Sequence, residues 1–401
     1  MKKALTVLLS FGVLLILSAS SAHALPGTDA NAVAEPWPEI GPLLESKVRA
    51  VQVVGGLIWL GGKFSNATDS TGATRSVSNL VAFDAGTGRF ASVSAPGFTS
   101  SGAEIWDLDV RSGELIVGGK FVNPANSAQK NLAAVNLSTG AVRWFKGAPT
   151  AKTVLVNGDS VYAAGTTLGL WNAATGSPVW KGRTKVTVQA TLRGHSTPPA
   201  YRDLVLAGGA LFAACQCDFA DGQPVKALIK LSTDGVLDPS WVPSDLTPGG
   251  ASGASTATGI AVTTDGSALY LGAGGSDFFA KYSFAEALQW KRDTSGSVQS
   301  LEIMGGQVVV GGHFVEIADA TGDRCGFKSS NPGDLDPFGE CVRHNYLAAY
   351  GTNGALDAWT PSVTGKFNGI WDLEAEGAAL HFGGEFTRVN GVNATFYGKL
   401  N

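Results

Sequence analysis

One short motif recurs along the chain and limits the possible folds more than any other feature. An apolar run is followed by two glycines, a variable residue and a phenylalanine in four copies, and three degenerate copies keep the apolar run and a small residue. The complete copies are Trp59–Phe64, Ile116–Phe121, Val309–Phe314 and His381–Phe386, and the degenerate copies are Tyr162–Gly165, Phe212–Cys215 and Tyr270–Ala273. Such internal repetition indicates an array of similar structural units.

A second apolar segment precedes each copy of the motif. Its first residue lies 10 positions before the first small residue of the motif in six copies, and 12 positions before it in the fifth, where residues 265–267 lengthen the turn. These first residues are Val51, Leu108, Val154, Leu204, Ile260, Leu301 and Leu373. A constant separation here, with variable separations elsewhere, predicts a tight antiparallel hairpin in each copy.

Two further segments follow each hairpin. The first is apolar, as in residues 79–83, and the second follows a Thr-Gly or Asn-Gly type turn and ends in an aromatic residue. These aromatic residues are Phe90, Trp144, Trp180, Trp241, Trp290 and Trp359. Six copies therefore predict four strands each, whereas the seventh reaches Asn401 without a fourth strand.

Four-stranded units repeated seven times predict an all-β protein with the fold of a seven-bladed β-propeller. A candidate for the missing strand of the seventh unit lies upstream of the first hairpin, in residues 34–40, because Trp37 and Pro38 parallel the Trp-x-Pro sequences that begin at Trp241 and Trp359. We expect this N-terminal segment to complete the last blade and close the ring. An open solenoid of hairpins is the alternative, although solenoids normally need capping repeats.

The first 24 residues have the features of a secretory signal peptide. Two lysines precede an apolar stretch from Leu5 to Leu17, and a small-x-small cleavage sequence occupies residues 22–24. An uncleaved membrane anchor is the alternative, but the apolar stretch is shorter than the ~20 residues that a span needs. We expect residues 25–401 to form one exported domain, extracellular or periplasmic, that is monomeric and has no membrane span. The formal net charge of −4 argues against nucleic acid as a partner.

All four cysteines lie beyond the predicted signal peptide, and an exported protein sits where disulfides persist. Cys325 and Cys341 flank a Gly-, Ser- and Asp-rich insertion at residues 318–344, and a bond between them would contribute ~3 kcal/mol in the chain-entropy model. Cys215 and Cys217 are two positions apart on one predicted strand, near the upper limit of Cα separation for a disulfide. We favour two buried thiols at the second site, with a redox-active pair as the alternative.

The insertion also concentrates oxygen donors, which hard cations prefer as ligands. Candidate calcium ligands are Asp334, Asp336 and Glu340, together with Asp319, Asp323 and Asn331. Their order matches no EF-hand loop, so a solvated acidic loop is favoured over a calcium site. No cofactor is predicted.

The repeats resemble those of a group of secreted bacterial proteins built from delta-sixty-type propeller repeats. The pattern of that group is an apolar strand, Gly-Gly-x-Phe, then Asn-Leu-Ala-x-apolar, then Thr-Gly-x-x-x-Trp, and it is matched over residues 34–401. The resemblance implies a propeller fold. It implies no particular activity, because the group is largely without an assigned one.

The turns between the third and fourth segments also look like the tryptophan-docking motif of quinoprotein dehydrogenases. The matching stretches are Ala82–Gly88, Ala134–Gly140 with Trp144, and Trp171–Gly176 with Trp180. In that family the motif packs neighbouring blades together, so its presence does not imply the quinone. Those enzymes usually have eight blades and adjacent cysteines beneath the cofactor, whereas this chain has seven predicted units and no Cys-Cys pair.

The first strand of each propeller unit lines the central channel, whose entrance is a natural place for a ligand. Aligning the hairpins places one residue per unit just before the apolar position: Ala50, Asp107, Thr153, Asp203, Gly259, Ser300 and Asp372. One step earlier stand Arg49, Trp106, Lys152, Arg202, Thr258, Gln299 and Trp371. Successive residues of a strand point to opposite faces, so we expect only one of the two sets to face the channel. Ordinary blade packing and surface ion pairs are the alternative interpretation of both sets.

Acids beside aromatic platforms suit a sugar or a cationic group. The sequence contains no nucleophile elbow, no His-Glu-x-x-His and no phosphate-binding loop, so enzyme signatures are sparse. The leading hypothesis is therefore a secreted, non-enzymatic propeller that binds a glycan, a peptide or a cell-surface protein. A hydrolase or lyase that acts on polysaccharide with carboxylates such as Asp107 and Asp372 is the alternative, and a quinoprotein-like oxidoreductase comes third.

Overall fold

The computed structural model describes residue 25 and residues 39–40, 47–188, 198–246, 258–320, 325 and 340–401. The predicted signal peptide lies outside the described residues. Within the described part, nearly all regular structure is β-strand, with one short 3-10 helix at Ser244–Leu246. No described helix is long and apolar enough to cross a membrane. The prediction of an all-β fold is confirmed.

Each predicted hairpin is present as two adjacent antiparallel strands. The first strands, which we call the inner strands, are β2 (Lys47–Val54), β7 (Glu104–Arg111), β11 (Thr153–Asn157), β16 (Ala200–Ala207), β21 (Thr258–Thr264), β25 (Val298–Met304) and β30 (Val363–Glu376). Their partners, in the same order, are β3 (Leu57–Lys63), β8 (Glu114–Asn123), β12 (Ser160–Ala164), β17 (Ala210–Gln216), β22 (Ala268–Gly274), β26 (Gln307–Gly312) and β31 (Ala379–Val389).

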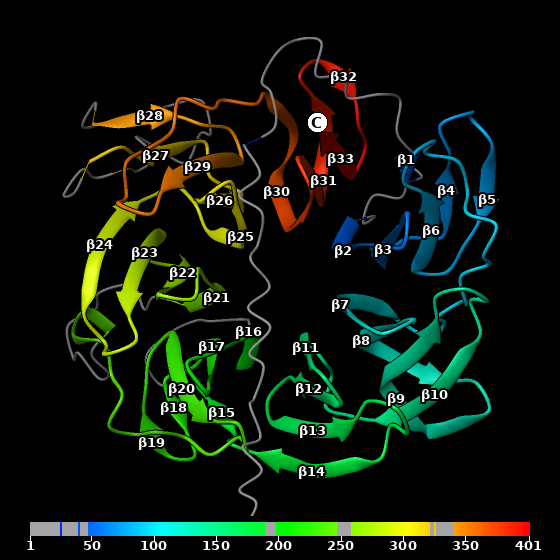
Figure 1. The fold of residues 1–401 in the computed structure, drawn as a ribbon, viewed down its shortest axis with the longest axis horizontal. Coiled ribbons are helices and arrows are strands. Elements are labelled where there is room, and N and C mark those ends of the chain that lie inside the picture. Colours follow the sequence, from blue (N-terminus) through cyan, green and yellow to red (C-terminus); the bar gives the residue numbers. More distant parts are fainter. Residues whose placement is uncertain are drawn as a thin grey trace, which may run out of the picture.

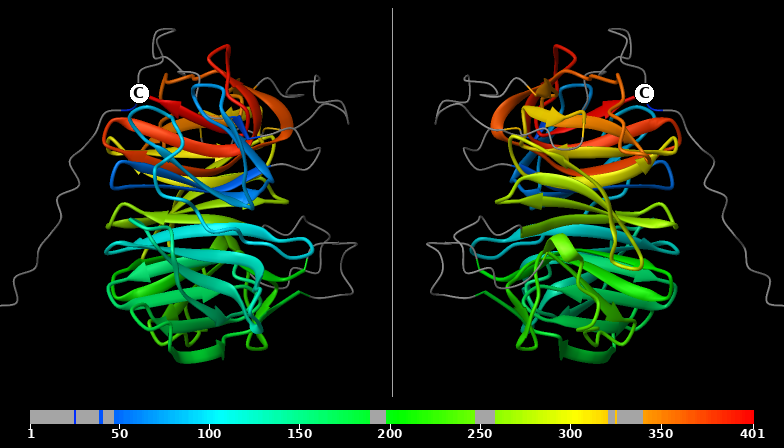
Figure 2. Two further views of the ribbon diagram at one scale, coloured as in Figure 1. Left: turned by 90° about the vertical axis from the view of Figure 1, so that its right-hand side faces the viewer. Right: turned by 90° about the vertical axis from the view of Figure 1, so that its left-hand side faces the viewer.

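The inner strands surround a common centre (Figure 1). Each inner strand contacts the next one along the chain, and the last, β30, contacts the first, β2. The strands run along the short axis of the molecule, across its thickness (Figure 2). The ring is therefore closed by packing of the last inner strand against the first.

A third strand pairs with the outer side of each hairpin. In chain order these strands are β6 (Leu80–Asp84), β9 (Asn126–Asn136), β13 (Leu168–Asn172), β20 (Leu228–Ser232), β23 (Phe278–Ser283), β29 (Leu347–Gly351) and β33 (Tyr397–Leu400). A regular fourth strand extends three of the sheets, as β10 (Val142–Gly147), β14 (Pro178–Arg183) and β24 (Leu288–Asp293). In the last sheet the short β32 (Val392–Asn393) also pairs with β31.

The fourth segment of the first, fourth and sixth sheets departs from the prediction. It makes only isolated bridges, at Phe90, Leu237 and Leu356. In the fourth and sixth sheets the bridge residue is followed by an aspartate, and the carboxylates of Asp238 and Asp357 each accept a backbone N–H from two residues ahead. In these two sheets, turns of this kind lead the chain away from the hydrogen-bonded ladder of strands. The first, fourth and sixth sheets each have three regular strands instead of four.

The apolar core lies between neighbouring sheets. One cluster of buried side chains joins Trp59 and Ala82 of the first sheet to Leu108 and Val117 of the second. Two tryptophans of the fourth strands, Trp144 and Trp290, reinforce such junctions with a hydrogen bond, as where Trp144 Nε1 donates to the carbonyl oxygen of Ala173 in the next sheet at 3.1 Å. Here the tryptophan-docking motif packs sheets together, as the resemblance implied.

The two glycines of the repeated motif are required by two different close approaches. A Cβ on Gly61 would lie 2.6 Å from the Ile105 side chain of the next sheet, and one on Gly62 would overlap the carbonyl oxygen of Lys47 in its own hairpin. Because an added methyl group has no room at either position, overpacking would cost about 1–3 kcal/mol or more. The most repeated feature of the sequence therefore serves packing, not chemistry.

Most of the predicted closing strand, including Trp37 and Pro38, lies outside the described residues, and its two described residues do not pair with the last sheet. Of residues 34–40, the structure describes Glu39 and Ile40, which form β1 and pair with β4 (Asn66–Thr68) beside the first sheet. Strand β4 pairs on its other side with β5 (Thr74–Ser76). No described residue of the N-terminal segment pairs with β33 of the last sheet. Packing and side-chain hydrogen bonds between β30 and β2 close the ring instead.

The predicted alignment of the fifth hairpin is also corrected. Its register pairs Gly259 with Ala273 and Ala261 with Gly272, which makes Ile260 an extra, bulged residue. The counterpart of Leu108 is therefore Val262, which lies 10 positions before Gly272, as in the other hairpins. The expected separation of 12 arose from starting the alignment two residues too early.

Both cysteine pairs form disulfides. Cys325 and Cys341 are bonded with a Cα separation of 5.7 Å, which confirms that prediction. Cys215 and Cys217 are also bonded, so the favoured pair of buried thiols is wrong. The strand β17 ends between them at Gln216, and the chain contracts to a Cα separation of 5.4 Å, well inside the range that a disulfide accepts.

Candidate functional site

A β-bulge interrupts the beginning of most inner strands. In six sheets the register with the partner strand skips one residue, and the skipped residues are Arg49, Trp106, Arg202, Ile260, Gln299 and Trp371. In the third sheet the ladder begins directly after Lys152. A bulge re-aims the side chain of the extra residue and breaks the strict alternation of faces. Members of both candidate sets make contacts between neighbouring inner strands, and which set faces the channel stays a prediction.

Cations and tryptophans alternate in a continuous row across this end of the ring. The guanidinium carbon of Arg49 lies 4.4 Å from the ring centroid of Trp106 and 3.9 Å from that of Trp371. The Lys152 ammonium lies over the Trp106 ring. Cation–π attraction of this kind holds side chains from neighbouring sheets together. We call Arg49, Trp106, Lys152, Arg202 and Trp371 the mouth cluster.

The mouth cluster holds more positive than negative charge. Arg49 donates from Nε to Glu104 at 2.6 Å, whereas neither Lys152 nor Arg202 is paired with a carboxylate in the part of the chain that the structure describes. Burial, and then the charges of Arg202 and Arg49, lower the pKa of Lys152 to about 7. Burial, and then the charge of Arg49, lower the pKa of Arg202 to about 10. These shifts measure the cost of holding the cations close together in a poorly solvated place.

Three aspartates form the next layer, and each links two neighbouring inner strands. Each carboxylate accepts one backbone N–H from the following residue of its own strand and another from the next inner strand. Asp107 accepts from Leu108 and Val154, both at 2.8 Å, Asp203 from Leu204 at 2.8 Å and Val262 at 2.9 Å, and Asp372 from Leu373 at 2.9 Å and Val51 at 2.7 Å. Both oxygens of every aspartate are thus engaged in holding sheets together.

Burial raises the pKa of all three aspartates. The pKa of Asp203 is raised to about 6. The pKa values of Asp107 and Asp372 are raised well above the usual value, with the charge of Asp372 adding to burial for Asp107 and that of Glu374 adding to burial for Asp372. Raised pKa values are common among catalytic acids, but buried structural carboxylates show them as well. The hydrogen bonds to backbone N–H groups identify these three as structural.

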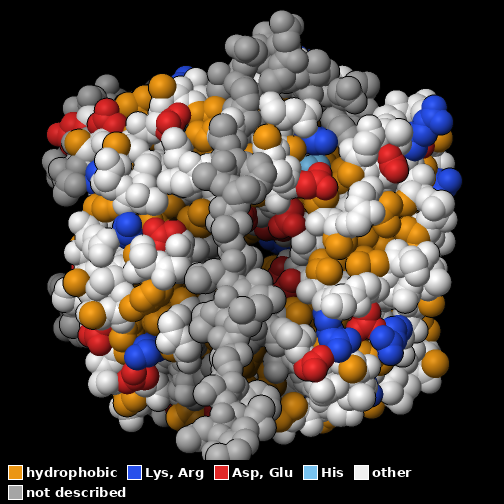
Figure 3. Space-filling model, in the orientation of Figure 1, with side chains coloured by type: hydrophobic (Ala, Val, Ile, Leu, Met, Phe, Trp, Pro, Cys, Tyr) orange, Lys and Arg blue, Asp and Glu red, His pale blue; other side chains and the backbone are white. Residues whose placement is uncertain are grey.

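A second acidic layer lies two residues further along the inner strands. Asp109 accepts the N–H of Val156 at 2.6 Å, which repeats the link made by Asp107. Glu374 accepts Gln52 Nε2 at 2.6 Å across the junction of last and first sheets. Burial raises the pKa of Glu302 to about 7, and burial followed by the charge of Glu302 raises that of Glu374 to about 8. Acidic side chains lie along the visible side of a hollow near the centre of one face of the ring (Figure 3).

Replacing both Glu302 and Glu374 by glutamine is expected to stabilise the protein at alkaline pH. Their folded pKa values are above the unfolded value of ~4.3, so their contribution to stability is complete below about pH 4 and is lost as the pH rises through about 7 to 8. The double variant should gain about 1–3 kcal/mol at pH 8.5 and much less at pH 5. Chemical unfolding at both pH values tests this, with the exposed Asp234→Asn as control. An equal gain in stability at both pH values would contradict the raised pKa values of Glu302 and Glu374.

Sequence alignment of the hairpins named the eight candidate residues, and the structure brings them to neighbouring positions on the inner strands. They are Arg49, Trp106, Asp107, Lys152, Arg202, Asp203, Trp371 and Asp372. The alignment of the hairpins missed the second acidic layer of Asp109, Glu302 and Glu374. The sequence contained this information, because these residues stand two positions after Asp107, Ser300 and Asp372 and so share the same face of each strand.

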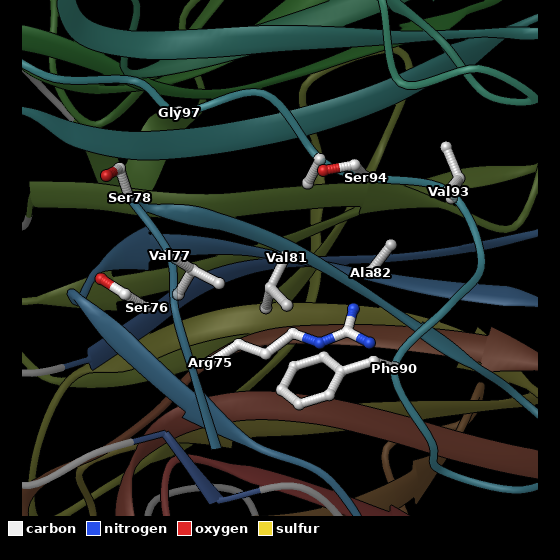
Figure 4. Close-up of a pocket in the computed structure, with 11 residues that line it drawn as sticks. Arg75, Ser76, Val77, Ser78, Val81, Ala82, Phe90, Val93, Ser94 and Gly97 are labelled. Atoms are coloured by element: carbon white, nitrogen blue, oxygen red, sulfur yellow. The ribbon is translucent and has the colours of Figure 1, made fainter. Parts of the chain in front are cut away.

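A separate pocket of ≈ 200 Å³ lies beside β5 and β6 (Figure 4). The Arg75 guanidinium carbon lies 4.3 Å from the ring centroid of Phe90 at its edge. Ala91 donates its N–H to the carbonyl of Ala82 here, so a methyl group occupies the place that the indole of Trp144 takes opposite Ala134 in the second sheet. The pocket is smaller than the ~300–1,000 Å³ of ordinary ligand sites.

The calcium prediction falls mostly outside the described residues. Asp334 and Asp336 are not described, and Glu340 is exposed. Among the residues that the structure does describe, no three acidic, histidine or cysteine side chains are grouped so as to hold a metal ion.

Comparisons with known proteins indicate the fold. Residues 78–228 match the family described as outer membrane protein assembly factor BamB, which is less than half of the chain. No match was found among curated proteins.

Solved structures resemble this chain over most of its length. The WD40 β-propeller domain of Doa1 has a TM-score of 0.51 at 10% identity, covering 91% of this chain and 97% of that one. The WD40 repeats of RRP9 have a TM-score of 0.53 at 10% identity, covering 94% and 98%. The computationally designed Ika8 protein has a TM-score of 0.51 at 11% identity, covering 90% and 98%. At such low identity these likenesses show a β-propeller fold and nothing about function.

Proposed function

We propose that the chain is an exported, seven-bladed β-propeller that binds an extracellular glycan, peptide or cell-surface protein at the mouth cluster without converting it. Seven inner hairpins with closing contacts between β30 and β2 support the blade number. Two disulfides support an oxidising location outside the cytosol. The delta-sixty-type repeats and their secreted relatives agree with this assignment.

The proposal that the ligand is bound without conversion rests on the hydrogen bonds of the three channel aspartates. A glycosidase needs one carboxyl group that delivers a proton and a second that acts as base or nucleophile, and both must reach the substrate. Both carboxylate oxygens of Asp107 and of Asp372 instead accept backbone N–H groups of two neighbouring strands. The mouth cluster, by contrast, offers cations without carboxylate partners and aromatic side chains, which are binding groups.

A quinoprotein-like oxidoreductase is less well supported. The tryptophans that resemble its docking motif are used between sheets, as Trp144 and Trp290 donate hydrogen bonds to carbonyl oxygens of Ala173 and Thr352. The match to the BamB family covers residues 78–228, which include the turn and Trp144 of the second sheet.

The proposal is tested by incubating the purified chain with arrays of glycans and peptides and following both retention and product formation. We expect retention of a ligand that is recovered unchanged, and weaker retention by a Trp106→Ala/Trp371→Ala variant. Release of product would favour the hydrolase if Asp107→Asn and Asp372→Asn abolish it while Asp203→Asn preserves it. The Asp203 variant is the control because it loses an equivalent structural link.

A further inference from the structure

We propose that the mouth cluster recognises a carboxylate group on its ligand, held between Lys152 and Arg202. The inference rests on the proposed function, because it names the chemical class of ligand bound at the same site. A sugar acid and an acidic peptide are two sources of the same group.

The first argument is the inventory of polar groups at the mouth. Trp106 Nε1, Trp371 Nε1 and Arg202 Nε are buried and have no hydrogen-bond partner in the described structure. The Lys152 ammonium, which lies over the Trp106 ring, donates no hydrogen bond within the described residues either. Every one of these groups is a donor, and buried polar groups in proteins are normally satisfied. A ligand that complements them must supply acceptor oxygens.

The second argument is charge. Glu104, the one acid among the charges that act on Lys152, is already held by Arg49 at 2.6 Å. The oxygens of the aspartate layer accept backbone N–H groups such as those of Val154 and Val262, and no ion pair in the described residues joins this layer to Lys152 or Arg202. The electrostatic influences on Lys152 are those of Arg202, Arg49, Glu104 and Lys47, three cations and one acid. An anion placed there would relieve the repulsion, and a carboxylate accepts bonds from a guanidinium in a favourable paired geometry.

The third argument is the response to pH. Burial lowers the pKa of Lys152 to about 7, and the charged groups that face it are Arg202, Arg49, Glu104 and Lys47. A bound carboxylate favours the protonated ammonium, so binding should take up a proton near pH 7. Affinity is therefore expected to fall as the pH rises from about 6 to 8.5.

Calorimetric titration with defined probes tests the inference. The probes are trigalacturonate, its neutral methyl ester and a triglutamate peptide, each at pH 6 and low salt. We expect at least one acidic probe to bind, the methyl ester to bind at least about tenfold more weakly than trigalacturonate if the source is a sugar acid, and Lys152→Met and Arg202→Met each to weaken binding by about tenfold or more. Lys181→Met is the matched control, because Lys181 also lies near a tryptophan, 5.9 Å from the Trp171 ring centroid, but on the outer strand β14.

The outcomes separate this inference from the proposed function. Binding of the peptide alone, with the same loss in both variants, supports carboxylate recognition and assigns a peptide source. Failure of both acidic probes to bind, or equal binding by Lys152→Met, overturns the inference. Equal binding of the methyl ester and the acid overturns it while the binding function stands. The free Lys152→Met protein should melt no lower than the parent, since a buried unpaired cation is removed, so lost binding would not reflect unfolding.

Discussion

Replacing Asp372 by alanine is expected to lower the free energy of unfolding by about 2–4 kcal/mol. The carboxylate accepts N–H groups of Leu373 at 2.9 Å and of Val51 at 2.7 Å, and the second of these bonds joins the last inner strand to the first. The substitution leaves both donors without an acceptor in a buried place. Urea unfolding of the oxidised protein measures the change.

Two companion variants make this result specific. Asp107→Ala removes an equivalent link between the second and third sheets and should cost a similar amount. Asp234→Ala removes an exposed carboxylate and should change stability by less than about 0.5 kcal/mol. Parental stability of Asp372→Ala would show that packing alone closes the ring.

Truncating Trp144 to alanine is expected to cost about 3–5 kcal/mol. The indole is buried between the second and third sheets and donates from Nε1 to the carbonyl oxygen of Ala173 at 3.1 Å. Its loss removes both a large apolar contact and a hydrogen bond. Thermal unfolding and denaturant unfolding should both show that the Trp144→Ala variant is less stable than the parent protein.

Phenylalanine at this position separates the two contributions. Trp144→Phe keeps an aromatic ring but loses the donor, so about 1 kcal/mol of the cost should come from the unsatisfied carbonyl and the remainder from lost volume. Trp180, in the next sheet, has an Nε1 without a partner in the described structure, so Trp180→Phe should cost less than Trp144→Phe. The reverse order would mean that the hydrogen bond contributes nothing.

The hairpins and the ring could be predicted because their signals are local and repeated. A tight turn fixes the distance between two strands, so Leu108 and Gly118 keep the same separation as Val51 and Gly61. The glycine pair reports a steric requirement that recurs wherever two sheets meet. Such requirements leave an apolar run and a small residue at the same spacing in every unit.

The errors concern features that residue types do not specify. The similarity of Trp37 and Pro38 to later Trp-x-Pro sequences could not reveal the partner of β1, because backbone groups at an edge accept any suitable strand. A bulge adds one residue without a distinctive side chain. The bulge at Ile260 therefore displaced the alignment of the fifth hairpin. The Cys215–Cys217 bond depended on a local contraction of the chain that an ideal strand lacks.

The seam between β30 and β2 has a consequence for the order of the units. Each described sheet of the ring draws its strands from one uninterrupted stretch of sequence, and no blade lends a strand to another. The seam is held by the same kind of carboxylate-to-backbone bond that joins blades elsewhere. The interfaces between described sheets are thus of one kind all round the ring, and a circularly permuted gene that opens a different inter-blade connection would encode the same set of interfaces.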